Sequence, residues 1–98
     1  MENRPLGWES FLDLCAKINS EEELDHFFDL FLTIEEKHLL ASRTLIIKEL
    51  LEDTLPQREI AKKHKVSIAQ ITRGSNALKR ANSSIKSFLQ KNLLHWWR

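Results

Sequence analysis

Apolar residues recur at intervals of three and four along most of this chain, and that spacing restricts its fold more than any other feature. The pattern is clear between residues 8 and 18 and again between residues 34 and 51. Such spacing is typical of amphipathic helices. The chain has two Gly, two Pro and no Tyr in 98 residues, so it lacks the residues that strands and tight hairpins need. The sequence therefore predicts an all-α fold.

Capping residues divide the chain into six predicted helices. Ser20 and Thr33 are each followed three residues later by Glu, which is the capping-box pattern of a helix start. Pro56 is tolerated in the first turn of a helix and disfavoured inside one, so a long third helix should end near Asp53. The first five predicted helices cover about residues 8–18, 20–31, 34–51, 56–63 and 68–79, and Ser67 caps the fifth. The sixth begins at Ser83 or Ser84 and runs through Trp96.

The second predicted helix is apolar around much of its circumference, with Leu24, Phe27, Phe28, Leu30 and Phe31. A helix of this kind needs cover on several sides, which favours a position between subunits. A chain of 98 residues also has a thin core for a monomer. We therefore expect the protein to form a homodimer.

Charge is distributed unevenly along the chain. Residues 1–55 carry five basic and thirteen acidic side chains, whereas residues 56–98 carry ten basic side chains and one acidic. The halves thus have net charges of −8 and +9, which leave a total of +1. The basic half suits a phosphate backbone, although an acidic protein surface or a membrane is also compatible with it.

Composition narrows the class of protein further. Hydrophobic residues make up 42% and charged residues 30% of the chain, a balance that argues against intrinsic disorder. No apolar run is long enough to cross a bilayer, and the start of the chain does not read as a signal peptide. The single Cys15 cannot form an internal disulfide. These features predict a cytoplasmic protein that does not enter the membrane.

The segment from 57 to 73 has the pattern of a helix-turn-helix. Ile60, Ala61, Val66 and Ile71 fall where two short crossing helices need apolar contacts. Lys65 occupies a turn position where such motifs usually have Gly. Two ordinary helices of a bundle with solvated polar faces would give a similar pattern, so this alternative stays open.

Polar side chains near the start of the second helix of this motif are suited to reading bases. Arg58 and Gln70 can pair with base edges in the major groove, while Ala69 and the methyl group of Thr72 can meet a thymine methyl group. The candidate DNA-binding residues are Gln57, Arg58, Ser67, Ile68, Ala69, Gln70, Thr72 and Asn76.

The segment Ile71-Thr72-Arg73-Gly74-Ser75-Asn76-Ala77-Leu78-Lys79 resembles the signature segment of tryptophan repressors. The similarity continues through Leu32-Thr33, Arg43, Glu49-Leu50-Leu51 and Gln57-Arg58-Glu59, and covers about Leu30 to Leu94. It implies a six-helix chain, intertwined with its twin, that presents two recognition helices to successive major grooves of operator DNA. Tryptophan repressors are themselves standard examples of this docking. We expect one domain over 1–98, with core and dimer helices in 1–55, the helix-turn-helix in 56–80 and a C-terminal helix in 81–98.

Two arginines suggest a ligand pocket. The guanidinium planes of Arg43 and Arg73 can enclose an indole ring while one of them also binds a carboxylate, and L-tryptophan offers both groups. The resemblance implies L-tryptophan as co-repressor, with Thr33 near its carboxylate. It also implies that backbone carbonyls of Leu30 and Leu32 accept hydrogen bonds from its ammonium group. We expect Gly74 to leave room for the ring.

Position 77 departs from the family pattern, because Ala77 stands where a serine hydroxyl is common near the ligand ammonium. Loss of one contact to a charged group weakens a site by roughly ten- to hundred-fold unless something compensates. Two ligands stay open: tryptophan with a water in place of the hydroxyl, or an indole compound that lacks the amine. The candidate ligand-binding residues are Leu30, Leu32, Thr33, Arg43, Arg73, Gly74 and Ala77.

Other functions explain the sequence less well than a ligand-dependent repressor does. The chain could be a ligand-independent helical module that docks on an acidic protein, or a constitutive DNA binder. An enzyme has little support, because the four His residues show no metal-ligand spacing, so no catalytic residue, metal or cofactor is predicted. The Trp96-Trp97 tail could pack on the dimer, bind a partner, or simply be ordered by the final helix.

Overall fold

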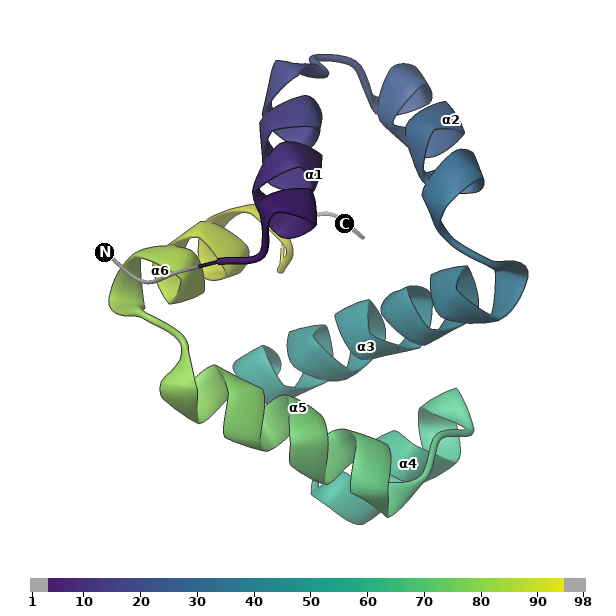
Figure 1. Cartoon of the computed structure of the whole chain (residues 1–98). Coiled ribbons are helices and arrows are strands. Elements are labelled where there is room, and N and C mark those ends of the chain that lie inside the picture. Colours follow the sequence, from purple (N-terminus) through teal and green to yellow (C-terminus); the bar gives the residue numbers. More distant parts are fainter. Residues whose placement is uncertain (1–3, 95–98) are drawn as a thin grey trace. The chain divides into compact units, whose positions relative to one another are not determined.

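A computed structural model describes residues 4–94 of the chain, and over these residues it contains six helices and no strand (Figure 1). This confirms the predicted all-α, six-helix fold. The Trp96-Trp97 tail and the end of the last predicted helix lie outside the described residues. The helices are α1 (Leu6–Lys17), α2 (Glu21–Phe31), α3 (Ile34–Glu52), α4 (Gln57–His64), α5 (Ile68–Arg80) and α6 (Ser83–Asn92).

The chain divides into two compact units, one up to residue 35 and one from residue 36 onward. The first unit, with α1 and α2, is held by aromatic rings. Phe11 on α1 lies 5.3 Å from Phe31 and 5.6 Å from Phe27, both on α2, between ring centroids. Edge-to-face and tilted contacts at these distances are favourable for aromatic rings. Three of the apolar residues predicted for the second helix, Phe27, Phe28 and Phe31, therefore contact α1 within this unit.

The core of the second unit joins three helices at three isoleucines. Ile46 on α3, Ile60 on α4 and Ile71 on α5 are fully buried against one another. This confirms the predicted apolar contacts of Ile60 and Ile71 between the two short helices, and it adds α3 as their common support. The partly buried side chains around the cluster are those of Leu50, Leu55, Ala61 and Val66.

Side-chain caps begin several of the helices. The hydroxyl of Ser20 accepts a hydrogen bond from the Glu23 backbone N–H at 3.1 Å, as the sequence predicts. The predicted cap of the last helix was wrong, because α6 is capped by Asn82 and not by Ser83 or Ser84. The carbonyl oxygen of the Asn82 side chain accepts from the Ile85 N–H at 2.8 Å, and Asn is among the strongest N-cap residues.

The turn between α4 and α5 is made by Lys65 in the left-handed region, with φ of 55° and ψ of 46°. Its backbone position ends α4 and allows the Val66 N–H to bond the Ala61 carbonyl at 3.0 Å. Glycine is the usual residue in this conformation because a Cβ atom makes it strained. The structure thus confirms that Lys65 occupies the turn position where such motifs usually have glycine.

Few apolar side chains of the described residues are removed from solvent. Among residues 4–94, the three isoleucines are the buried apolar side chains. Leu30 is 81% exposed and Ile34 is 70% exposed. Soluble monomers rarely leave many large apolar side chains uncovered. In the described part of the chain, no helix has both the length and the apolar character needed to cross a bilayer.

Candidate ligand cleft and DNA-reading surface

A cleft of about 370 Å³ lies in the second unit, between side chains of α3 and α5. Arg43 comes from α3, whereas Arg73, Asn76, Ala77 and Arg80 come from α5. Residues three, four and seven apart share one face of a helix, so the four residues of α5 form a single row along it. The volume falls within the range of small-molecule sites.

The cleft brings together three of the residues predicted to bind a ligand, namely Arg43, Arg73 and Ala77. It also contains Asn76, which was predicted to contact DNA. Arg80 was missed by the sequence analysis, although its spacing of seven residues from Arg73 places both on one helix face. That spacing was the signal that could have identified it.

Gly74, which is predicted to leave room for the ligand ring, is not among the residues that line the cleft. It is buried where α5 crosses α3, and an added Cβ atom would lie 3.0 Å from Cγ2 of Ile46 and 3.6 Å from Cδ1 of Leu50. The missing side chain therefore lets the two helices approach closely, and the room it creates is filled by the core. The role of Gly74 toward a ligand ring stays a prediction.

Three further predicted ligand residues belong to the first unit. Leu30 is in α2, and Leu32 is the residue that ends that helix, with its N–H bonded to the Phe28 carbonyl at 2.8 Å. Thr33 follows directly, before the start of α3. Their roles toward a ligand stay predictions.

The candidate DNA-reading residues are mostly exposed at the starts of α4 and α5. Gln57 and Arg58 lie in the first turn of α4 and are exposed. Ile68, Ala69 and Thr72 are exposed on the first half of α5. An exposed helix start of this composition, next to a second short helix, has the geometry that helix-turn-helix proteins use to reach base edges.

Ser67 and Gln70 form a reciprocal capping box at the start of α5. The Ser67 hydroxyl accepts from the Gln70 N–H at 3.1 Å, and the Gln70 side-chain oxygen accepts from the Ser67 N–H at 3.0 Å. A bidentate contact of glutamine with adenine needs both that oxygen and the amide nitrogen. The Gln70 oxygen already accepts from the Ser67 N–H, so a contact with adenine would use its second lone pair together with the amide nitrogen. The DNA contact of Gln70 stays a prediction.

A buried carboxylate fixes α4 on α3. Glu49 on α3 is 3% exposed, and its Oε2 lies 2.8 Å from Nζ of Lys63 and 2.6 Å from Nε2 of His64 on α4. Burial, the largest single influence on the carboxyl group, raises its pKa, but the hydrogen bonds and charges of Lys63 and His64 together outweigh burial. The pKa of Glu49 is lowered as a result. The sequence analysis missed this cluster, because no periodicity connects residues 15 positions apart on different helices.

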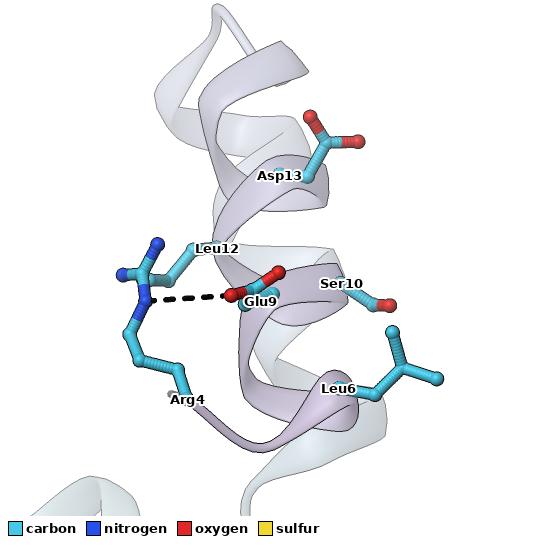
Figure 2. A pocket seen from close by; sticks show the side chains of 6 residues that line it. All are labelled: Arg4, Leu6, Glu9, Ser10, Leu12 and Asp13. Carbon is cyan, nitrogen blue, oxygen red and sulfur yellow. Dashed lines mark ion pairs between the residues drawn. The ribbon is translucent and has the colours of Figure 1, made fainter. Parts of the chain in front are cut away.

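Another hollow lies along α1 in the first unit (Figure 2). It has charged side chains of both signs, and Nε of Arg4 lies 3.8 Å from Oε1 of Glu9. An exposed pair of this kind contributes little to stability or to ligand selection. None of the predicted site residues lies in this hollow. Its lining residues are Arg4, Leu6, Glu9, Ser10, Leu12 and Asp13.

Comparison with known proteins gives consistent matches along nearly the whole chain. The sequence profile of the family described as Trp repressor protein matches residues 6–93. The "Trp operon repressor homolog" of Chlamydia caviae is 55% identical over 92 residues, which is 94% of this chain and 90% of that protein. The protein of the same description from Chlamydia trachomatis serovar L2 is 55% identical over 87 residues, with 89% and 93% covered. The one from Vibrio cholerae is 36% identical over 87 residues, with 89% and 84% covered.

Proposed function

The chain belongs to the Trp repressor family of DNA-binding transcriptional repressors, and on that premise we propose that it represses genes of tryptophan biosynthesis or uptake with L-tryptophan as co-repressor. One observation carries the proposal. The helix α5 has exposed candidate DNA-reading residues in its first turns, and it also supplies four of the five residues that line the cleft. A ligand in the cleft therefore touches the same rigid helix that would enter the major groove.

The chemistry of the cleft suits an aromatic amino acid. The guanidinium groups of Arg43 and Arg73 come from two helices and face one cleft, so they can hold the two faces of an indole ring by cation–π contact. Either guanidinium can also bind a carboxylate through two parallel hydrogen bonds. We assign Thr33 and the carbonyls of Leu30 and Leu32 to the polar groups of the amino acid, as the family resemblance implies.

The ligand acts by selecting one pose of α5. A ligand shifts an equilibrium between poses only by its difference in affinity for them, so tryptophan must bind better when α5 is placed for DNA. Operator affinity and tryptophan affinity then rise by the same factor, because coupling between two binding sites is reciprocal.

The repressor works as a homodimer in this proposal. Leu30 and Ile34 are highly exposed around the junction of α2 and α3, and Leu39 is also exposed. A second copy that covers them would bury apolar surface that one chain leaves in water. Twofold symmetry would present two copies of α5 to two half-sites. Residues 1–98 then act as one domain of the dimer, with 56–80 as the helix-turn-helix.

Two measurements on the full chain test this function. Sedimentation equilibrium should give a dimer at micromolar concentration, and a monomer would contradict the assembly. Footprinting on DNA upstream of tryptophan genes should show protection that requires tryptophan. Protection that is absent with tryptophan, or equally strong without it, would contradict the co-repressor role.

A further inference from the structure

Three lysines occur at the end of α4 and in the turn that follows it, and the structure gives them different surroundings. Lys63 is tied to α3, because its Nζ lies 2.8 Å from Oε2 of Glu49. Lys62 and Lys65 are exposed, and within residues 4–94 no ion pair engages either of them. The end of α4 and the turn therefore present two uncompensated positive charges to the solvent.

The two exposed lysines lie next to the residues that are predicted to read bases. Lys62 comes four positions after Arg58 on α4, so these side chains share one face of that helix. Lys65 lies two positions before Ser67, the cap at which α5 begins. Lys63 is about 100° around α4 from Lys62 and contacts α3 instead. A duplex that meets Arg58 and the start of α5 therefore brings its backbone close to Lys62 and Lys65.

Lys65 is an unfavourable residue for the backbone conformation at its position. Its φ of 55° lies in the left-handed region, where a Cβ atom is strained and glycine is the usual residue. Strained backbone positions cluster at functional sites, so an observed strain is a reason to look for a function. Within residues 4–94 the exposed side chain of Lys65 has no ion pair that would explain a lysine here. Its partner is therefore sought outside the chain.

We propose that Lys62 and Lys65 bind phosphates of the DNA backbone beside the bases that α5 reads, and that this contact is the reason for a lysine at the strained position 65. The proposal rests on the proposed function, because it takes α5 as the helix that enters the major groove. An ammonium group on a flexible stem binds a phosphate as a point charge. Such contacts add affinity for every sequence and fix the position of the protein on the duplex.

The test measures how the DNA affinity of the full chain depends on salt. Each phosphate contact contributes about 0.9 to the slope of log affinity against log salt concentration. Lys65→Gln removes the charge and keeps the Cβ atom, so a dimer that loses this lysine twice should have a slope smaller by about 2. Between about 50 and 200 mM salt, its affinity should then fall about tenfold less than that of the parent chain. Lys62→Gln should have the same effect.

Two kinds of DNA show whether the contact is to the backbone. The slopes are measured on a site selected from a random DNA pool and on unrelated DNA of the same length. The substitutions at positions 62 and 65 should reduce both slopes alike and leave the ratio of the two affinities unchanged, because phosphates carry no sequence information. A change in that ratio would mean that the lysines contact bases, which contradicts the proposal.

Further variants separate the charge of Lys65 from the shape of the turn. Lys65→Arg keeps the charge and should keep the slope. Lys65→Gly removes charge and strain together, so it should bind both DNAs more weakly with a smaller slope, although its backbone is relaxed. Lys63→Gln is the matched control, because it removes a nearby charge that Glu49 already compensates, and its amide can still donate to Glu49. The control should keep the slope within about 0.5 of the parent value.

Three results would overturn the proposal: an unchanged slope in Lys65→Gln, an equal loss in Lys63→Gln, or full DNA affinity in Lys65→Gly. Addition of L-tryptophan to the same titrations keeps the two claims apart. Operator binding that requires tryptophan but does not depend on Lys65 would refute the phosphate contact and leave the repressor function standing. A smaller slope in Lys65→Gln without any effect of tryptophan would support the contact and refute the co-repressor role. A parent chain that binds no DNA would refute both.

Discussion

The carboxylate of Glu49 on α3 lies 2.6 Å from the imidazole Nε2 of His64 at the end of α4. Because an ionised carboxylate can only accept hydrogen bonds, Nε2 carries the hydrogen in this contact. Lys63 adds a second donor to the same oxygen at 2.8 Å. The first helix of the helix-turn-helix is thus fixed to the long helix directly before the Lys65 turn, and this contact holds the geometry of the motif.

Removal of the Glu49 carboxylate should destabilise the fold. Glu49→Ala should lower the free energy of unfolding by about 1–3 kcal/mol, because it leaves the partly buried His64 without its partner. Urea denaturation measures this loss. Glu52→Ala is a suitable control, since its pair with Lys48 lies within one helix and should contribute about 0.5 kcal/mol or less. Equal losses in the two variants would contradict the role given to Glu49.

The same carboxylate predicts a pH dependence of stability. The pKa of Glu49 in the folded chain lies below its ordinary value of 4.5, so its ionised form stabilises the folded state. That stabilisation is fully present above pH 4.5 and is lost as the pH falls through the folded pKa. The gap in unfolding free energy between the parent chain and Glu49→Gln should therefore narrow on acidification from neutral pH. A gap that stays constant into strongly acidic solution would show that Glu49 is not the group responsible.

Glycine substitutions at two nearby lysines, one in the left-handed turn and one inside α4, should change the free energy of unfolding in opposite directions. Lys65→Gly should raise the free energy of unfolding by roughly 0.5–1 kcal/mol, because glycine adopts this conformation without strain. Lys62→Gly, inside α4, should lower it by about 1 kcal/mol through its poor helix propensity. Thermal unfolding measures the stability of both variants. Each variant loses one positive charge, so the difference between them reports the backbone conformation at the two positions. A loss of stability in both would mean that the turn is not strained by Lys65.

The DNA-reading surface predicts which substitutions abolish sequence preference. A preferred site is first selected from a random DNA pool. Arg58→Ala and Thr72→Ala should each lower the ratio of affinity for this site to affinity for unrelated DNA by about tenfold, because each removes a base contact. Lys91→Ala removes a charge on α6 and should affect all sequences alike. If the ratio is unchanged in both variants, a protein-docking module would explain the basic half better.

The helical architecture was predictable because its signals are local. The capping residues Ser20 and Ser67 and the helix breaker Pro56 mark helix starts through contacts within a few residues. The last helix is the exception, since Asn82 and the two serines after it are all acceptable caps, and the structure uses Asn82. Such local rules do not decide between adjacent candidates.

The site was predictable only in part because its parts come from different helices. Arg43, Arg73 and Ala77 were found through a family resemblance, while Arg80 required attention to the helix face that it shares with Arg73. Gly74 is next to Arg73 in the sequence, but neighbours in a helix point about 100° apart, and a Cβ atom at position 74 would meet Ile46. Distances between helices decide these roles, and sequence spacing alone does not give them.

The central claim is that a ligand held by Arg43 and Arg73 controls how α5 binds DNA. Titration of the selected operator with the full chain, at fixed salt and with increasing L-tryptophan, measures it most directly. Operator affinity should rise by about fivefold or more at saturation, and Arg43→Ala should remove most of that rise while leaving the basal DNA affinity in place. An operator affinity that saturating tryptophan does not change, or a response of Arg43→Ala equal to that of the parent chain, would contradict the claim.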